Sequence, residues 1–105
     1  MIAPQECDDM EQVRAAIDQL DDQLIALLAR RVQYIERAAQ LKPRLAIPAD
    51  VPERVRQVLL RVEASAEAMQ LPTDLALIIW RGIIEWSIAH ETALMARSGP
   101  QGKCC

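Results

Sequence analysis

The chain has 105 residues, enough for one small domain over residues 1–105 but too few for two independent hydrophobic cores. Hydrophobic residues make up 51% and charged residues 26%, a composition typical of folded proteins and not of disordered ones. Lysine and arginine total 12 against 15 acidic residues, so the formal net charge of -3 argues against a broad basic surface for nucleic acid.

The first predicted element is one long helix over about residues 10–42. Asp8 and Glu11 have the spacing of a capping box, and neither glycine nor proline occurs between them and Pro43. Apolar residues recur at intervals of three and four, which keeps one face of this helix apolar throughout. The apolar face comprises Val13, Ile17, Leu20, Leu24, Leu27, Leu28, Ile35 and Ala38.

Two shorter helices are predicted after a loop. The second helix covers about residues 52–69, with Asp50 or Val51 as its N-cap and proline in its first turn. A proline-containing turn then leads to a third helix over about residues 74–96, and we expect the tail 97–105 to be flexible. The fold class is therefore all-α, a three-helix chain with one very long N-terminal helix.

The length of the first helix predicts a dimer. About 33 residues make a helix of roughly 50 Å, whereas a compact globule of this chain length is about 33 Å across. The apolar face continues into the overhang, so we expect a second copy of the chain to cover it, with two-fold symmetry. The third helix is apolar nearly all round, which is typical of a helix buried on several sides.

Several charged residues lie where the pattern calls for apolar ones. Arg31 and Lys42 fall in the middle of the apolar stripe, and Glu91 lies on the apolar side of the third helix. A buried charge needs a partner of opposite sign, so something anionic should meet the two cations. Arg14 is some 42 Å from Lys42 along the helix, so an antiparallel partner would have to bring its own Arg14 to this site. Arg54 follows the loop after Lys42.

A purely structural interpretation accounts for the same residues. Arg31 and Glu91 would form a salt bridge, Lys42 would extend from the helix end into water, and Arg14 would lie on the surface. His90 is the only histidine and lacks a metal-ligand spacing, so we interpret it as a surface or interface residue and predict no metal site. No nucleophile triad, phosphate-binding loop or dinucleotide motif occurs.

The ends of the chain carry the cysteines. Cys7, Cys104 and Cys105 do not form a disulfide framework, because they are odd in number and two are adjacent. The N-terminus has no signal-peptide pattern, and no apolar run is long enough to cross a bilayer. We therefore expect a cytoplasmic protein that does not bind membranes.

These residues together resemble the all-helical chorismate mutase family over about residues 8–96. That family is an intertwined homodimer of three-helix chains in which one arginine of each pocket comes from the partner. The resemblance implies that Arg14 of the partner chain joins Arg31, Lys42, Arg54, Ser87 and Glu91 of the other. It rests on Val13-Arg14-x-x-Ile17-Asp18-x-Leu20-Asp21, Leu27-Leu28-Ala29-x-Arg31, Lys42, Pro52-Glu53-Arg54 and Ile83-Ile84-Glu85.

The resemblance implies rearrangement of chorismate to prephenate in one concerted step, without a nucleophile, a metal or a cofactor. Such an enzyme must hold the reactive conformer and stabilise the negative charge that develops on the ether oxygen. Arg14 and Arg31 would then bind carboxylates, Lys42 would donate to the ether oxygen, and Arg54 would assist near the loop. Catalysis is thus assigned to Lys42, Glu91 and Arg31.

Two positions depart from the family pattern. Many members have glutamine where this chain has Glu91, and because an ionised carboxylate cannot donate a hydrogen bond, we predict that Glu91 acts protonated. Val55 replaces a glutamate that binds the ring hydroxyl in true mutases. This substitution, with Pro4 and Cys7, is similar to the isochorismate pyruvate lyase branch, which makes salicylate and pyruvate, whereas Ser87 favours the mutase.

Chorismate mutase is accordingly the first prediction and isochorismate pyruvate lyase the alternative. A dimeric helical scaffold or regulatory module without catalysis is a second alternative, because it would keep the apolar stripes. Residues 43–51 connect Lys42 to Arg54, and we expect this loop to close over bound substrate.

Overall fold

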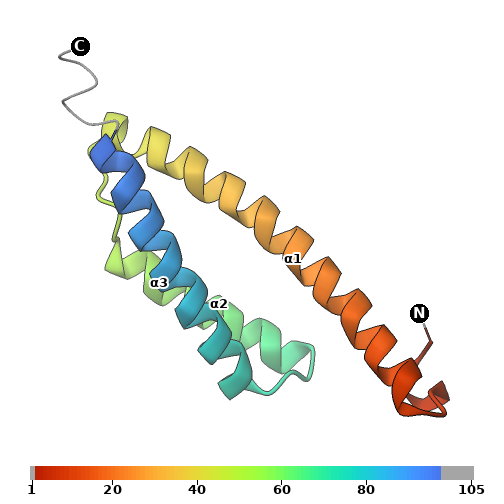
Figure 1. Cartoon of the computed structure of the whole chain (residues 1–105). Helices are drawn as coiled ribbons and strands as arrows, with labels where there is room; N and C mark the ends of the chain where they lie inside the picture. Colours follow the sequence, from red (N-terminus) through yellow and green to blue (C-terminus); the bar gives the residue numbers. More distant parts are fainter. Residues whose placement is uncertain (1, 98–105) are drawn as a thin grey trace. The chain divides into compact units, whose positions relative to one another are not determined.

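The computed structural model describes residues 2–97, and its regular structure there is entirely helical (Figure 1). The predicted all-α, three-helix fold is confirmed, and each long helix ends within one residue of its predicted limits. Arg97 belongs to the third helix, not to the expected tail, and residues 98–105 lie outside the described residues. The elements are η1 (Pro4–Glu6), α1 (Met10–Leu41), η2 (Pro43–Leu45), α2 (Pro52–Ala68) and α3 (Thr73–Arg97).

The N-terminus of α1 is capped one residue later than the sequence pattern predicts. Asp9 Oδ1 accepts a hydrogen bond from the backbone N–H of Gln12 at 2.9 Å, and Gln12 Oε1 accepts one from the backbone N–H of Asp8 at 2.6 Å. The predicted capping box of Asp8 and Glu11 is therefore wrong by one position. Its physical role is the same, since two N–H groups outside the helical ladder gain acceptors.

The C-terminus of α1 ends where proline forbids a further turn. Pro43 begins η2, whose last residue is followed by Ala46 in the left-handed region at φ 56°. Lys42 lies between the two helices, and its carbonyl accepts hydrogen bonds from the N–H groups of Leu45 and Ile47 at 3.1 and 2.9 Å. The start of the loop is therefore folded tightly around Lys42.

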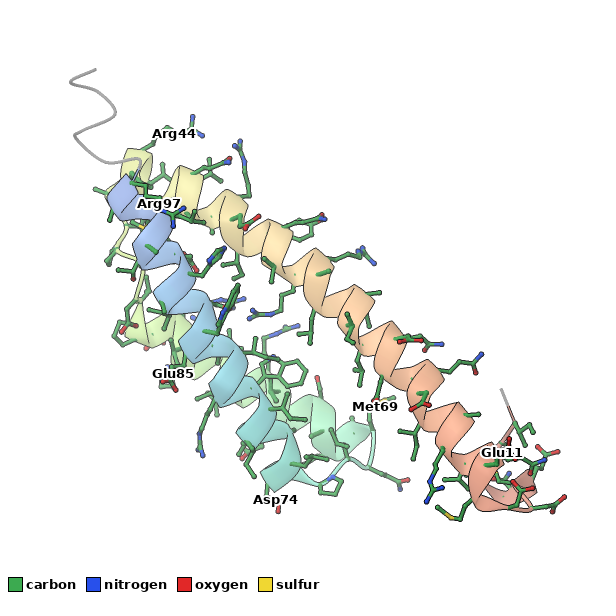
Figure 2. All side chains as sticks on the ribbon, viewed as in Figure 1. Glu11, Arg44, Met69, Asp74, Glu85 and Arg97 are labelled. Carbon is green, nitrogen blue, oxygen red and sulfur yellow. The ribbon has the colours of Figure 1, made fainter. Side chains whose placement is uncertain are left out.

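The α2–α3 connection is a Schellman turn built without glycine. Gln70 adopts φ 58°, and the N–H of Leu71 bonds the carbonyl of Ala66 at 2.8 Å. Helix α3 begins after this connection. Asp74 lies in its first turn and Arg97 in its last, as Figure 2 shows. These charges complement the helix dipole at both ends.

The described chain forms two compact units. Residues 2–34 contain η1 and most of α1, and none of them is buried. The large aliphatic side chains of this stretch are 41–65% exposed, and they belong to Ile17, Leu20, Leu24, Ile25, Leu27 and Leu28. A single helical stretch has nothing of its own to bury them against.

Residues 35–97 form the second unit, in which α2 packs against α3 and the last turns of α1 contact α3. Its apolar core is small, and α3 still exposes aliphatic and aromatic side chains over much of its length. The buried apolar residues are Ala39, Ala66, Ala76 and Ile84, and the exposed ones on α3 are Leu75, Ile78, Ile79 and Trp86. Within residues 2–97, no helix has the length and apolarity required to cross a membrane.

Candidate active site

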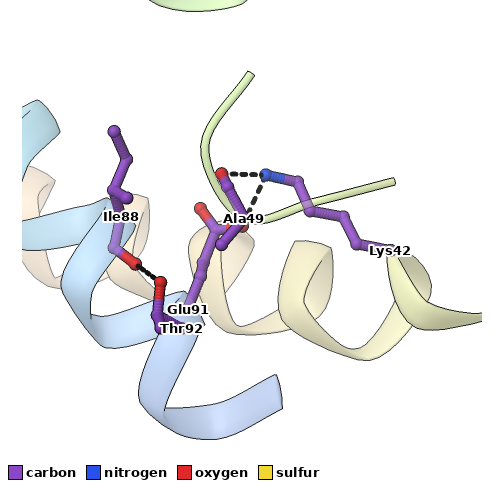
Figure 3. A network of polar contacts seen from close by, with 5 residues as sticks. All are labelled: Lys42, Ala49, Ile88, Glu91 and Thr92. Carbon is purple, nitrogen blue, oxygen red and sulfur yellow. Dashed lines mark hydrogen bonds and ion pairs between the residues drawn. The ribbon is translucent and has the colours of Figure 1, made fainter. Parts of the chain in front are cut away.

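The end of α1, the loop and α3 meet at the side chain of Lys42 (Figure 3). Lys42 Nζ lies 2.7 Å from Glu91 Oε1 and donates a hydrogen bond to the backbone carbonyl of Ala49 at 2.9 Å. The side chains of Lys42 and Glu91 are 19% and 5% exposed. Two predicted catalytic residues are therefore in direct contact.

The local fold explains why Lys42 points inward. Lys42 directly follows the last turn of α1, and its carbonyl accepts hydrogen bonds from the N–H groups of Leu45 and Ile47 in the loop. Its ammonium reaches the far part of the same loop at Ala49. Both ends of Lys42 thus hold the segment 43–51, which connects this residue to α2. The expected closure of this loop over substrate stays a prediction.

Glu91 is a buried acid whose charge is met by a cation. It is 4% exposed, and the ammonium of Lys42 compensates part of the cost of removing a carboxylate from water. Within the described residues, the ammonium of Lys42 is the polar partner of Glu91 Oε1, which makes no further hydrogen bond. A ligand that draws the ammonium away would leave this oxygen able to accept a hydrogen bond or, when protonated, to donate one.

Ser87 lies one turn before Glu91 on the same face of α3 and is 4% exposed. Its hydroxyl donates to the backbone carbonyl of Ile83 at 2.7 Å. Thr92 makes the corresponding bond to Ile88 on the exposed side, as Figure 3 shows. Ser87 and Glu91 are the two buried polar residues among those described, so the α3 part of the predicted site is the most polar place in the core.

Arg54 and Val55 lie in the first turns of α2. Val55 is half-buried and Arg54 is exposed, and within residues 2–97 no ion pair joins Arg54 to Glu91. Arg54 thus projects from the helix start that follows the loop, with its guanidinium available to an anion.

Arg14 and Arg31 belong to the unit of residues 2–34. Arg14 is exposed, whereas Arg31 is half-buried. Lys42 and Arg31 are therefore both withdrawn from bulk water to a degree that is unusual for lysine and arginine.

A second polar cluster joins α1 to α3, and the sequence interpretation of His90 as a surface or interface residue did not identify it. His90 Nε2 lies 2.9 Å from Glu36 Oε2, and its ring stacks on Trp86 with centroids 4.6 Å apart and planes at 20°. The four-residue spacing of Trp86 and His90 was the available sequence signal, because it places the two rings on one face of α3.

An open groove of about 440 Å³ lies beside this second cluster. It contains none of the predicted site residues. Its walls come from the last turns of α1 and of α3, and they are formed by Glu36, Ala39, Gln40, Leu94 and Arg97.

The chorismate mutase type II family matches residues 13–92, about three quarters of the chain. The chain belongs to this family. The match runs from the residue before Arg14 to the residue after Glu91, so it includes every position of the predicted site.

Relatives of the type II chorismate mutase family differ in activity and size. An isochorismate pyruvate lyase of Pseudomonas aeruginosa is 34% identical over 92 residues, covering 87% of this chain and 89% of that protein. A chorismate mutase of Methanocaldococcus jannaschii is 26% identical over 85 residues, covering 81% and 82%. A T-protein of Enterobacter agglomerans is 31% identical over 83 residues, which are 79% of this chain but 22% of that longer protein.

Proposed function

We propose that this chain is a chorismate mutase that converts chorismate to prephenate without a cofactor or covalent intermediate. The observation that carries the proposal is the buried contact of Lys42 with Glu91, beside the buried Ser87, in a chain of this family. Binding would bring the negatively charged substrate to an ammonium that now rests on Glu91 and the carbonyl of Ala49.

Each polar group has a role that its chemistry supports. Lys42 donates to the ether oxygen, where negative charge develops as the carbon–oxygen bond breaks and the new carbon–carbon bond forms. When the substrate draws the ammonium away, Glu91 takes up a proton and donates a second hydrogen bond to that oxygen, and Ser87 contacts a polar group of the substrate. Arg31 and Arg54 bind the carboxylates, for which the planar guanidinium is well suited.

The working form in this proposal is a homodimer in which Arg14 of the partner completes each site. The exposed aliphatic side chains of residues 17–28 support it, because monomeric proteins rarely leave so large an apolar stripe in water. A second copy of the same helix is the simplest cover. We place the enzyme in the cytoplasm, and it needs no nucleic acid or membrane partner.

Isochorismate pyruvate lyase is the second candidate function. Two observations favour it: the 34% identity to such a lyase over nearly the whole of both chains, and the half-buried Val55, which cannot hydrogen bond a ring hydroxyl. The lyase reaction also breaks the bond to the ether oxygen, so the same cations serve both reactions.

The decisive experiment is to assay the purified protein with chorismate and, separately, with isochorismate. Formation of prephenate supports the mutase, whereas formation of salicylate with pyruvate supports the lyase. Arg31→Ala should abolish either activity while the helical circular dichroism and the unfolding midpoint stay close to the wild type. A folded wild-type protein that turns over neither compound would contradict the proposal. The non-catalytic helical scaffold would then be the remaining interpretation.

The shared site has its own test. Chains with Arg14→Ala and chains with Lys42→Met are each expected to be inactive, but when they are unfolded together and refolded, mixed dimers regain one intact site. Half of the dimers are then mixed, so about a quarter of wild-type activity returns. No recovery would mean that Arg14 serves its own chain.

A further inference from the structure

A polar contact between α1 and α3 has no part in the proposed reaction. Glu36 Oε2 lies 2.9 Å from His90 Nε2, and Trp86 stacks on the imidazole on α3. The side chains of Glu36 and His90 are 47% and 27% exposed, so water reaches the contact at its outer edge. Exposed pairs of this kind add little stability. The main consequence of this contact is therefore its effect on the orientation of α1 relative to α3.

On α1, this contact and the Lys42–Glu91 contact lie on either side of Ala39. At about 100° per residue, Ala39 lies midway between Glu36 and Lys42 on the surface of α1. On α3, Leu94 lies about one turn beyond His90 and Glu91, at an angle between theirs, and it lines the same groove as Ala39. Ala39 is 2% exposed, so its small side chain permits a close approach of the helices.

Burial of one small residue does not by itself fix the rotation of α1. Without a further contact, a turn of α1 about Ala39 would carry Lys42 away from Glu91. Glu36 lies on the opposite side of Ala39, so holding it against His90 removes this freedom. The stacked indole of Trp86 restricts the imidazole ring, which gives the contact a fixed direction.

From this geometry we infer that Glu36 and His90 are positioning residues, which orient the last turns of α1 so that the Lys42 ammonium is held in the catalytic site. The inference rests on the proposed function for its kinetic consequence. Polar and ring contacts join the two side chains to each other and to Trp86, so both act through the rotation of α1.

Single substitutions test the kinetic consequence. Glu36→Ala and His90→Ala remove the contact and should lower kcat about tenfold with KM changed less than about threefold, since binding by the arginines is unaffected. Glu36→Gln and His90→Gln keep a hydrogen-bonding group at the same reach and should restore most of kcat. The double alanine variant should be no slower than the slower single variant, because the residues act as one unit.

Arg37→Ala is the matched control. Arg37 follows Glu36 in α1, and its guanidinium donates to Gln40 within the same helix at 2.8 Å, so its removal costs a side-chain contact without affecting α3. It should leave kcat unchanged. Equal losses in Arg37→Ala and Glu36→Ala would overturn the inference, and so would alanine variants that only unfold at a lower temperature with kcat unchanged.

A second readout does not depend on activity. Lys42 and Lys103 are the two lysines of the chain, so brief acylation followed by mass spectrometry gives the labelling of Lys42 relative to Lys103 as an internal reference. Glu36→Ala and His90→Ala should raise this ratio severalfold, and Arg37→Ala should not. A wild type without turnover defeats the proposed function alone, whereas an unchanged ratio defeats the positioning role alone.

Discussion

The two units of the chain use their side chains in opposite ways. In residues 2–34 no residue is buried, and most of the large apolar side chains are exposed. In residues 35–97 two polar residues, Ser87 and Glu91, are buried as deeply as the core alanines. Exposed apolar groups and buried polar groups both cost free energy. The second unit offsets part of this cost through the contacts of Glu91 with Lys42 and of Ser87 with Ile83, whereas within residues 2–34 the first unit has no such contact for its apolar face.

The exposed apolar face of the first unit favours assembly, whereas the buried polar residues of the second unit favour chemistry. An apolar helix face in water is stabilised only when another surface covers it, so the first unit carries the signal for a partner. A buried acid is stabilised by its counter-charge, and the same burial strengthens the electric field that acts on a bound molecule. A substitution on the apolar face of the first unit should therefore change a different property from a substitution at the buried polar residues of the second.

The largest expected effect is on turnover, from Lys42→Met. Loss of one donor to the developing negative charge should lower kcat by about 10²–10³-fold. It also leaves Glu91 buried without its cation, which should destabilise the fold by about 3 kcal/mol. Steady-state kinetics and denaturant unfolding measure the two losses separately.

The double variant Lys42→Met/Glu91→Gln separates the catalytic loss from the structural one. Removing the carboxylate charge should return most of the stability, because a neutral amide costs less to bury than an unpaired ion. Turnover should remain low. Recovery of both properties together would mean that Lys42 supports the fold and not the reaction.

The next effect is on assembly, from Leu24→Glu in the centre of the exposed stripe. Leu24 is 58% exposed, and a charge there would be buried twice in a two-fold interface. The dimer dissociation constant should rise at least about tenfold. Analytical ultracentrifugation over a concentration series measures it.

Arg30→Glu is the control for Leu24→Glu, because it places the same acid on the opposite side of the helix. It should leave the association unchanged. If the wild-type chain sediments as a monomer at every concentration, the interpretation of the stripe as a self-association surface is wrong, and the contrast between the units needs another explanation.

The sequence predicted the parts of this molecule that depend on local pattern. Pro43 predicted the end of α1 and Pro52 the start of α2, because proline cannot donate the helical hydrogen bond. Glu91 was identified because a carboxyl group interrupted an apolar face, and the structure places it among the buried residues. Fold class and one of the two most buried site residues thus follow from spacing alone.

The remaining features depend on geometry that spacing does not encode. Asp8 and Asp9 are chemically equal caps, and only the path of the chain selects Asp9. The carbonyl of Ala49 has no side-chain signature, so its contact with Lys42 was not predictable. Glu36 and His90 are 54 positions apart, and their meeting depends on how α1 and α3 pack.

A smaller effect concerns the protonation of Glu91. If Glu91 donates to the ether oxygen as an acid, kcat should fall as pH rises, by up to about tenfold per pH unit once the carboxylate dominates. Glu91→Gln donates at every pH and should flatten the profile. Rates measured across pH with both proteins check this, and a variant profile that falls with the wild-type midpoint would exclude the role.

The smallest effect should appear far from both the stripe and the site, at the turn between α2 and α3. Gln70 adopts φ 58°, a conformation that costs a residue with a side chain about 1 kcal/mol or more and costs glycine almost nothing. Gln70→Gly should therefore raise the free energy of unfolding by about 0.5–1 kcal/mol, after the greater flexibility of glycine in the unfolded chain is subtracted.

Met69→Gly is the matched control one residue earlier, where φ is -95° and any residue fits, and it should lower stability instead. Thermal unfolding measures both, and kcat should stay at the wild-type value in Gln70→Gly. If both glycine variants shift the unfolding midpoint in the same direction, strain at Gln70 is not a source of instability, and the turn is held by the hydrogen bond from Leu71 to Ala66 alone.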